Sequence, residues 1–130
     1  MENRGRSTSY RGLVAIHASR TVDKAGDRDE RIVRWFGEEA SLGIPLGAVL
    51  AVVELVDCHP ASPRDVQPSC CLPWGETWHL RGGERVQAYH LVLANVRPLA
   101  RPVYVRGSLA VPWRLPEDVA AAVEREVAHA

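Results

Sequence analysis

Two ionisable side chains lie within apolar stretches of the sequence, where a catalytic site would place its proton-transfer groups. His17 directly follows the apolar residues 13–16, and Glu54 lies within the apolar run of residues 47–57. An imidazole titrates near neutral pH, so His17 is a candidate general base or a donor to a base edge. A carboxylate among apolar residues must find a partner or take up a proton. His17 and Glu54 are therefore the acid–base pair that a catalytic hypothesis would use.

Each of these two residues also has a structural interpretation. His17 could be a hydrogen-bonded core histidine on a buried strand, and Glu54 could pair with a buried arginine such as Arg4.

Arginine and aromatic side chains suggest a second kind of chemistry, the binding of a phosphate or a nucleobase. Arg4 and Arg11 can each grip a phosphate through two parallel hydrogen bonds, with Glu2 fixing a guanidinium or a base edge. His90 and Trp113 are candidates to stack on a base. The alternative for the N-terminal residues is a flexible, solvated terminus. The alternative for His90 and Trp113 is packing in the core. The full predicted ligand-binding set is Glu2, Arg4, Tyr10, Arg11, His17, Ser19, His90, Trp113 and Arg114.

Cysteine and histidine residues in the middle of the chain suggest zinc at first sight, namely Cys58, His59, Cys70, Cys71 and His79. Their spacing contains no Cys-x-x-Cys knuckle, and two adjacent cysteines seldom ligate one metal. We therefore predict no metal ligands and no cofactor. The sequence also lacks a nucleophile elbow for a serine hydrolase and a glycine-rich phosphate loop.

The elements that must position these residues follow from periodicity. Residues 12–18 are short, apolar and bounded by turn-forming residues, which predicts a buried strand carrying His17. Asp27 and Glu30 resemble a capping box, and the apolar spacing after them predicts a helix over residues 27–41. The run at 47–57 is apolar on both faces, as in a central strand.

The second half of the chain predicts two more strands and one more helix. Residues 59–87 are rich in Pro, Gly and Ser and predict a long surface loop. Strands are expected at 88–94 and 103–106, with Pro98 and Pro102 in the link between them. A helix is expected over 116–127. Together these elements predict one α+β domain over residues 1–130, built as a small, mostly antiparallel β-barrel.

The order of several short motifs resembles the ASCH domain family, whose members have the PUA-like fold. The family's Gly-x-Lys-x-x-Glu-x-Arg signature ends with two positions that Glu2 and Arg4 match, while its Gly and Lys would fall before Met1. We therefore expect the family's N-terminal helix to be missing, through a truncation or a misassigned start. The motifs that carry the resemblance are Glu2-Asn3-Arg4, Tyr10-Arg11-Gly12, Ile16-His17-Ala18-Ser19, residues 52–58, residues 89–93, Arg97-Pro98-Leu99, Arg106-Gly107 and Trp113-Arg114-Leu115-Pro116.

This resemblance implies a PUA-like barrel with a cleft for RNA or a nucleotide-like small molecule. A second hypothesis is a small hydrolase of RNA or modified nucleosides that uses His17 and Glu54, although the signature lysine is absent. A third is a non-catalytic or degenerate interaction module. A sheet edge left open by the missing helix would favour a homodimer.

Charge and composition narrow the class of partner. The formal net charge is zero, yet residues 81–114 carry six arginines against one glutamate. A neutral total argues against a strongly basic nucleic-acid binder, whereas the arginine-rich segment leaves a local basic surface available. There is no signal-like N-terminus and no apolar run long enough for a membrane span, and the odd number of cysteines fits a reducing compartment. A cytoplasmic protein without membrane contact is the expectation.

Overall fold

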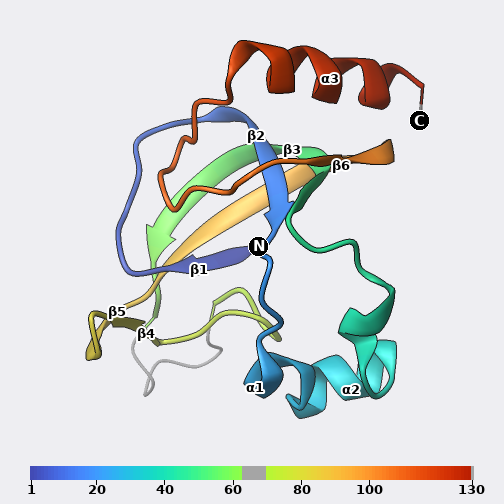
Figure 1. The fold of residues 1–130 in the computed structure, drawn as a ribbon. Helices are drawn as coiled ribbons and strands as arrows, with labels where there is room; N and C mark the ends of the chain where they lie inside the picture. The colour runs from blue at the N-terminus through green and yellow to red at the C-terminus, as the bar shows by residue number, and fades with distance from the viewer. Residues whose placement is uncertain (63–69, 130) are drawn as a thin grey trace. The chain divides into compact units, whose positions relative to one another are not determined.

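A computed structural model describes residues 1–62 and 70–129 and shows an α+β chain with an antiparallel sheet (Figure 1), which confirms the α+β class and the antiparallel pairing that the sequence predicts. Four strands pair in the order β1-β6-β3-β2, and β4 and β5 form a separate two-stranded sheet. The strands are β1 (Glu2–Arg4), β2 (Gly12–Ala18), β3 (Ala48–Pro60), β4 (Trp78–Arg81), β5 (Glu84–Gln87) and β6 (Tyr89–Tyr104). The helices are α1 (Lys24–Asp27), α2 (Glu30–Phe36), the 3-10 helix η1 (Ala40–Gly43) and α3 (Glu117–Ala128).

Two units of dense internal contact divide the chain. The first unit consists of Met1–Val14 and Val53–Val96, and the second consists of Ala15–Val52 and Arg97–Ala130. The buried side chains of the first unit include Val53, Leu55, Ala61, Ala88, His90 and Leu91, and those of the second include Ala48, Val49, Ala51 and Val123. Strand β3 contributes to both cores because the boundary between the units falls within it, between Val52 and Val53.

Strand β6 is continuous over 16 residues, so the prediction of two strands joined by a proline link is wrong. Pro98 and Pro102 lie inside it. Because they are separated by an even number of residues, their nitrogens point to the same side of the strand. A proline is tolerated where that side makes no ladder hydrogen bond. β1 pairs with residues 89–91, and the two prolines lie beyond that pairing.

The helix predicted over residues 27–41 is also wrong, because three short helices occupy this region. Asp23 caps α1 and Asp29 caps α2, each by accepting backbone N–H groups of the first turn. Asp27, the expected cap, instead accepts hydrogen bonds from the backbone N–H and the hydroxyl of Ser41, at 3.2 and 2.6 Å. Gly37 ends α2 with a φ of 84°.

Regular structure occupies part of the predicted loop over residues 59–87. Strand β3 continues to Pro60, and β4 and β5 form a hairpin. Gly82 and Gly83, with φ values of 58° and 82°, make its turn, as a two-residue hairpin connection requires. Each of the two strands has four residues, which is too few to give a clear periodic signal. Residues 63–69 of the predicted loop lie outside the described residues.

Other expectations agree with the structure. The strand predicted over residues 12–18 is β2, and the helix predicted over 116–127 is α3. The expected burial of that strand is wrong, because every residue of β2 is at least partly exposed. Strand β1 was not predicted; it pairs with β6 in a register that places Asn3 opposite His90. Among the described residues, no helix has the length and apolar character needed to cross a membrane.

Candidate metal centre

Two imidazoles and two thiols converge in the first unit. His59 lies near the end of β3, His90 lies on β6, and Cys70 and Cys71 lie in the turn that precedes β4. One ligand atom from each of the four residues lies within 4.8 Å of every other. His90 is 1% exposed, so its ring is held inside the unit and cannot swing into solvent. The four residues have the composition of a Cys2His2 metal site.

Two sulfur-to-nitrogen distances in this cluster are close to those around a tetrahedral metal ion. Nδ1 of His90 lies 3.2 Å from Sγ of Cys70, and Nε2 of His59 lies 3.5 Å from Sγ of Cys71. Zn–S and Zn–N bond lengths imply a sulfur-to-nitrogen edge of about 3.6 Å in a tetrahedral site. The two imidazoles make an edge-to-face pair with ring centroids 5.4 Å apart. Small adjustments of the four side chains would complete the tetrahedron.

The outer nitrogen of His90 has a partner that fixes its tautomer. Its Nε2 lies 2.8 Å from the backbone carbonyl oxygen of Glu76. A carbonyl can only accept, so Nε2 carries the hydrogen. In the neutral ring, the lone pair is then on Nδ1, the atom that lies beside Cys70. This is the arrangement of a metal-ligating histidine, whose second nitrogen donates to a carbonyl or carboxylate.

His59 has the same arrangement with a carboxylate. Its Nδ1 donates to Oδ2 of Asp57 at 2.7 Å, which leaves the lone pair on Nε2, beside Cys71. The hydrogen bond to Asp57 raises the pKa of His59, and the same bond lowers the pKa of Asp57. A carboxylate behind a ligating imidazole orients the ring and makes it a better donor to a metal.

The two thiols differ in their tendency to ionise. Hydrogen bonds from Ser62, including its backbone N–H at 3.4 Å, lower the pKa of Cys70 to about 6, and the His59 imidazole contributes. Burial raises the pKa of Cys71, and the adjacent Cys70 raises it further. The thiolate is the form that binds metal, so Cys70 is prepared for ligation, whereas Cys71 must lose a proton.

Backbone conformation explains how adjacent cysteines face the same point. Cys71 has a φ of 61°, in the left-handed region, and its carbonyl accepts the N–H of Gly75 at 2.8 Å. A Cβ on Gly75 would lie 2.5 Å from the carbonyl oxygen of Cys70 and 2.9 Å from Cε1 of His90. Only glycine fits at this position, because the turn closes tightly over the buried imidazole.

The N-terminal residues predicted to bind a ligand make hydrogen bonds to neighbouring groups of the protein. Arg4 Nε donates to Oε1 of Glu2 at 2.6 Å, and the hydroxyl of Tyr10 donates to the carbonyl of Leu13 at 2.8 Å. Arg11 donates to the backbone carbonyl of Thr8, at 3.0 Å, and to that of Tyr10, at 2.8 Å. Its guanidinium also lies 3.7 Å from Asp57 in an exposed ion pair.

The proposed acid and base belong to different units. His17 lies in the second unit, where its Nε2 donates to the carbonyl of Val105 at 2.7 Å and its ring meets Trp113 edge to face, with centroids 5.6 Å apart. Glu54 lies in the first unit and accepts a hydrogen bond from Asn95 at 2.7 Å. Ser19 donates to the carbonyl of Thr21, and Arg114 is exposed.

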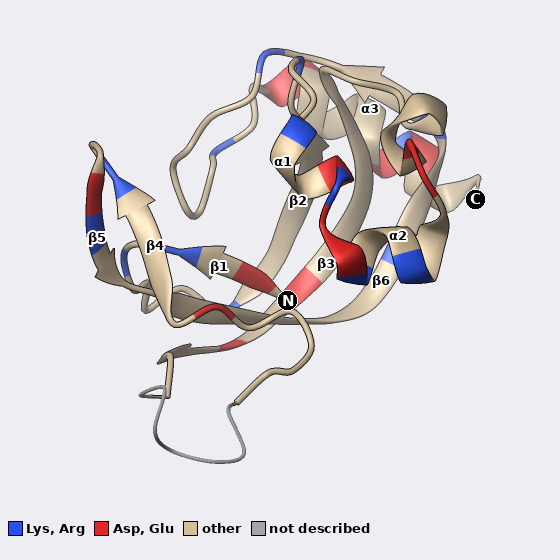
Figure 2. Ribbon diagram, turned by 90° about the horizontal axis from the view of Figure 1, so that it is seen from below, with Lys and Arg blue, Asp and Glu red and all other residues tan. Residues whose placement is uncertain are grey.

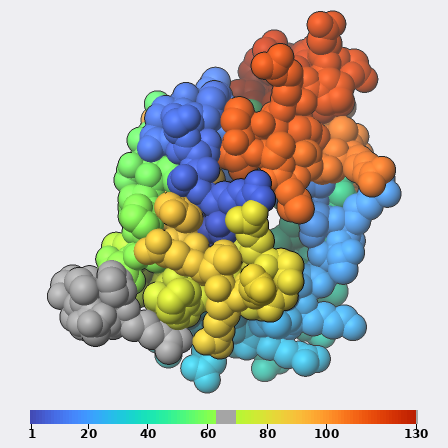
Figure 3. Space-filling view, turned by 90° about the vertical axis from the view of Figure 1, so that its left-hand side faces the viewer, coloured from blue at the N-terminus to red at the C-terminus, as the bar shows by residue number. Residues whose placement is uncertain are grey.

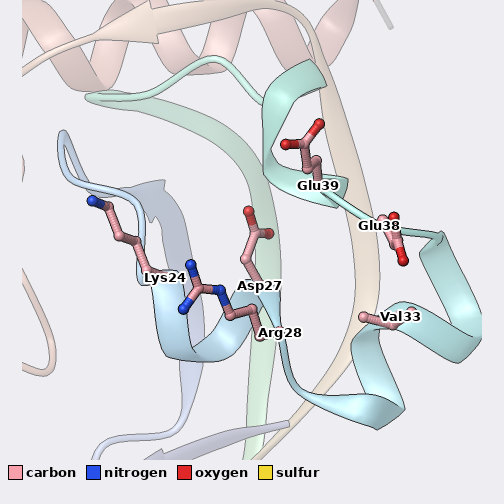
Figure 4. A pocket seen from close by; sticks show the side chains of 6 residues that line it. All are labelled: Lys24, Asp27, Arg28, Val33, Glu38 and Glu39. Atoms are coloured by element: carbon pink, nitrogen blue, oxygen red, sulfur yellow. The ribbon is translucent and has the colours of Figure 1, made fainter.

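A cavity of about 510 Å³ lies elsewhere, in the second unit, beside α1 and α2 (Figure 4). Its lining mixes cations and anions, and none of the predicted site residues belongs to the lining set of Lys24, Asp27, Arg28, Val33, Glu38 and Glu39.

Sequence reasoning missed the four-residue cluster because it judged the cysteines by their spacing to one another. Cys58 and His79, which it considered, are not members of the cluster, whereas His90, which it assigned to base stacking, is a member. The turn-forming residues between Cys71 and Glu76 were the signal that a tight turn could bring adjacent thiols to face two distant histidines. No family model, curated protein or solved structure matches this chain.

Proposed function

We propose that this protein binds one Zn²⁺ ion through His59, Cys70, Cys71 and His90. The observation that carries the proposal is the convergence of four ligand atoms within 4.8 Å of one another. Each imidazole directs an unprotonated nitrogen at a thiol, while its other nitrogen is held by Asp57 or by the carbonyl of Glu76. A core histidine in a purely structural role would not need two thiols at the distances of a coordination shell.

The ligand chemistry selects the metal. Calcium and magnesium require oxygen ligands, whereas two thiolates and two imidazoles in a tetrahedron suit zinc. A two-iron cluster with the same residues binds both histidines to one iron and both cysteines to the other. Here each sulfur lies beside an imidazole nitrogen, at 3.2 and 3.5 Å, which favours a single ion at the centre.

Four protein ligands leave no open coordination position, so the centre is structural in this proposal. The ion would join the end of β3, the turn at residues 70–76 and the start of β6, and so fix the position from which the β4–β5 hairpin leaves. Because the site forms only in the folded chain, the free energy of metal binding stabilises the first unit.

Metal content of the purified chain tests this proposal, and the sequence supplies matched controls. One zinc per chain is expected in the wild type and in Cys58→Ser and His79→Ala, which alter residues outside the cluster. Cys70→Ser, Cys71→Ser and His90→Ala should each lose most of the bound zinc. A metal-free wild type, reconstituted under reducing conditions and still unable to bind zinc, would refute the proposal.

We also propose that the β4–β5 hairpin binds single-stranded RNA, the partner class that the ASCH resemblance and its PUA-like fold imply. Trp78 and Leu80 are 47% and 68% exposed, and in the hairpin register they lie opposite Gln87 and Arg85. These four side chains share one face of the hairpin. An aromatic ring beside arginine is the usual combination for stacking a base and contacting a phosphate.

The other face of the hairpin is occupied by the protein itself. A Cβ on Gly5 would lie 3.1 Å from both His79 and Val86, so this face packs against the N-terminal segment. The Trp78 face is therefore the one available to a ligand, and Figure 2 shows Lys or Arg colouring on both strands. Arg85 on β5 shares the Trp78 face, whereas Arg81 on β4 lies on the opposite face, where its side chain packs near Gly5.

Binding of a short labelled oligouridine tests this second proposal. Trp78→Ala should weaken binding by about 1 to 3 kcal/mol for each stacked base. Trp35→Ala, which removes an indole that is 67% exposed on α2, is the matched control and should leave binding unchanged. Affinity that is equal in all three proteins, or that is insensitive to salt, would contradict the proposal.

The structure provides less support for the hydrolase hypothesis. Nε2 of His17 donates to the carbonyl of Val105, and a Cβ on Gly107 would lie 2.6 Å from Nδ1. Val105 thus engages one ring nitrogen of His17 and Gly107 packs against the other, which disfavours His17 as a general base.

A further inference from the structure

We infer that Asn3 is a positioning residue of the metal centre, and that it links metal binding to the docking of the N-terminal strand β1. This inference rests on the proposed zinc site. The side chain of Asn3 acts through the turn that carries Cys70 and Cys71, and its backbone pairs with that of His90. Its role follows from three sets of contacts, all within the first unit.

The first set holds the turn to β1. The side-chain amide of Asn3 donates from Nδ2 to the carbonyl of Trp74 at 3.0 Å, and its Oδ1 accepts the backbone N–H of Glu76 at 2.9 Å. Both bonds span more than 70 residues of sequence. An asparagine side chain has one carbonyl and one amino group, and here both are used on the same turn.

The second set of contacts connects the turn to His90, one of the four proposed metal ligands. The peptide segment that Asn3 holds at the N–H of Glu76 also presents the carbonyl of Glu76 to Nε2 of His90, at 2.8 Å. That carbonyl fixes the tautomer in which Nδ1 of His90 faces Cys70. Gly75, between the two points held by Asn3, packs against Cε1 of His90. Asn3 therefore sets the position of the group that orients a ligand.

The third set is the strand pairing itself. Asn3 is the cross-strand partner of His90, so the backbone of β1 lies beside this metal-ligating residue. The side chain of Asn3 meanwhile holds the turn. The N-terminal segment and the hairpin form one continuous surface in the space-filling view (Figure 3). β1 has three residues, too few for strand pairing alone to hold it firmly. Its docking depends on the turn, and the order of the turn depends on the metal.

Linkage makes this dependence reciprocal. If docking of β1 strengthens zinc binding by a given factor, then zinc strengthens docking of β1 by the same factor. Residues behind a metal ligand typically contribute about tenfold or more to affinity. We therefore expect a factor of about ten in both directions.

Two measurements on the full chain test the inference. In a competition titration with a chromogenic chelator, Asn3→Leu should bind Zn²⁺ about tenfold more weakly than wild type. Asn3→Asp keeps the acceptor for Glu76 but loses the donor to Trp74. Its zinc affinity should therefore lie between those of Asn3→Leu and wild type. Glu2→Gln, the neighbouring change on β1 that leaves the turn contacts in place, should bind zinc as wild type does.

Limited trypsin digestion gives the reciprocal readout, which a merely destabilising substitution would not reproduce. Zinc should slow cleavage after Arg4 about tenfold in the wild type, because only undocked β1 is cut. It should not slow that cleavage in Asn3→Leu. Cleavage after Arg114, in the second unit, serves as the internal control and should be independent of zinc in every variant.

The outcomes separate this inference from the proposal beneath it. Failure of the wild type to bind zinc would overturn both. Tight zinc binding in the wild type, combined with unchanged affinity in Asn3→Leu or with cleavage after Arg4 that ignores zinc, would overturn the role of Asn3 alone. Weakened binding in Asn3→Leu, intermediate binding in Asn3→Asp and zinc-dependent protection of Arg4 would establish it.

Discussion

Nδ1 of His90 lies 3.2 Å from Sγ of Cys70, although 20 residues separate them in the sequence. The imidazole is buried on β6, its other nitrogen is engaged by the carbonyl of Glu76, and the thiol is hydrogen-bonded by Ser62. Three separate segments thus fix the two atoms in one relative position. His59 and Cys71 repeat the relationship at 3.5 Å, which makes the pair part of a four-ligand site.

Removing the carboxylate behind His59 should weaken zinc binding. Asp57→Ala leaves Nδ1 of His59 without its acceptor, so the ring is less well oriented and donates less strongly. We expect a loss of about 10-fold to 100-fold in zinc affinity, measured by chelator competition. Arg11→Ala removes the exposed ion pair with Asp57 and two hydrogen bonds to backbone carbonyls of the N-terminal segment, and it should change zinc affinity little. Equal affinity in Asp57→Ala and wild type would show that this hydrogen bond has no role in metal binding.

A methyl group on Gly75 should disrupt the same site from the other side. In Gly75→Ala, the new Cβ meets the carbonyl of Cys70 and the ring of His90, so the turn must open. Overpacking of this kind costs about 1 to 3 kcal/mol in the free energy of unfolding, and zinc affinity should fall with it. Gly43→Ala places its Cβ in open space and is the control for both measurements. Wild-type zinc affinity in Gly75→Ala would mean that the tight turn is unnecessary.

Zinc affinity should rise with pH, because protons compete with the metal for its ligands. Cys70, with a pKa of about 6 in the metal-free chain, has lost its proton above that pH. Cys71 and His59 have raised pKa values, so they hold their protons to higher pH and must release them on binding. The slope of affinity against pH should therefore steepen below about pH 6, where Cys70 adds its proton. Calorimetry in buffers of different ionisation enthalpy counts the protons released, and a count of zero at neutral pH would contradict the assignment of the ligands.

Zinc should also protect the chain against heat. Free zinc at one hundred times its dissociation constant adds about 2.7 kcal/mol of stability, which raises Tm by about 10 °C in a protein of this size. Cys58→Ser should show the full increase and Cys70→Ser almost none. A zinc-dependent increase that survives in Cys70→Ser would show that the metal binds elsewhere.

Much of the fold could be predicted from local patterns. Strand β2 and helix α3 were predicted because each combines one clear periodicity with boundary residues. The helix over residues 27–41 failed because Asp23 and Asp29 cap two separate turns, while Asp27 binds Ser41. Strand β6 was divided in the prediction because Pro98 and Pro102 are strand breakers in general, and only the sheet order shows that they lie beyond the pairing with β1.

The candidate site could not be predicted, for a different reason. Its four ligands come from two strands and a turn, so their proximity depends on tertiary structure and not on spacing along the chain. Asn3 shows the same limit. Sequence reasoning singled out Glu2 and Arg4, which flank it and bond to each other, whereas the residue between them holds the turn of the metal centre.

Absorption spectroscopy of the Co²⁺-substituted chain tests the central claim most directly, since it reports both geometry and thiolate ligation. The account predicts, at one equivalent of Co²⁺, intense visible bands of a tetrahedral ion with thiolate-to-cobalt charge transfer, which zinc then abolishes. Cys58→Ser should reproduce this spectrum, and Cys70→Ser and Cys71→Ser should each lose most of the charge-transfer intensity. Weak bands of an octahedral ion in the wild type, or an unchanged spectrum in both Cys70→Ser and Cys71→Ser, would contradict a metal centre at His59, Cys70, Cys71 and His90.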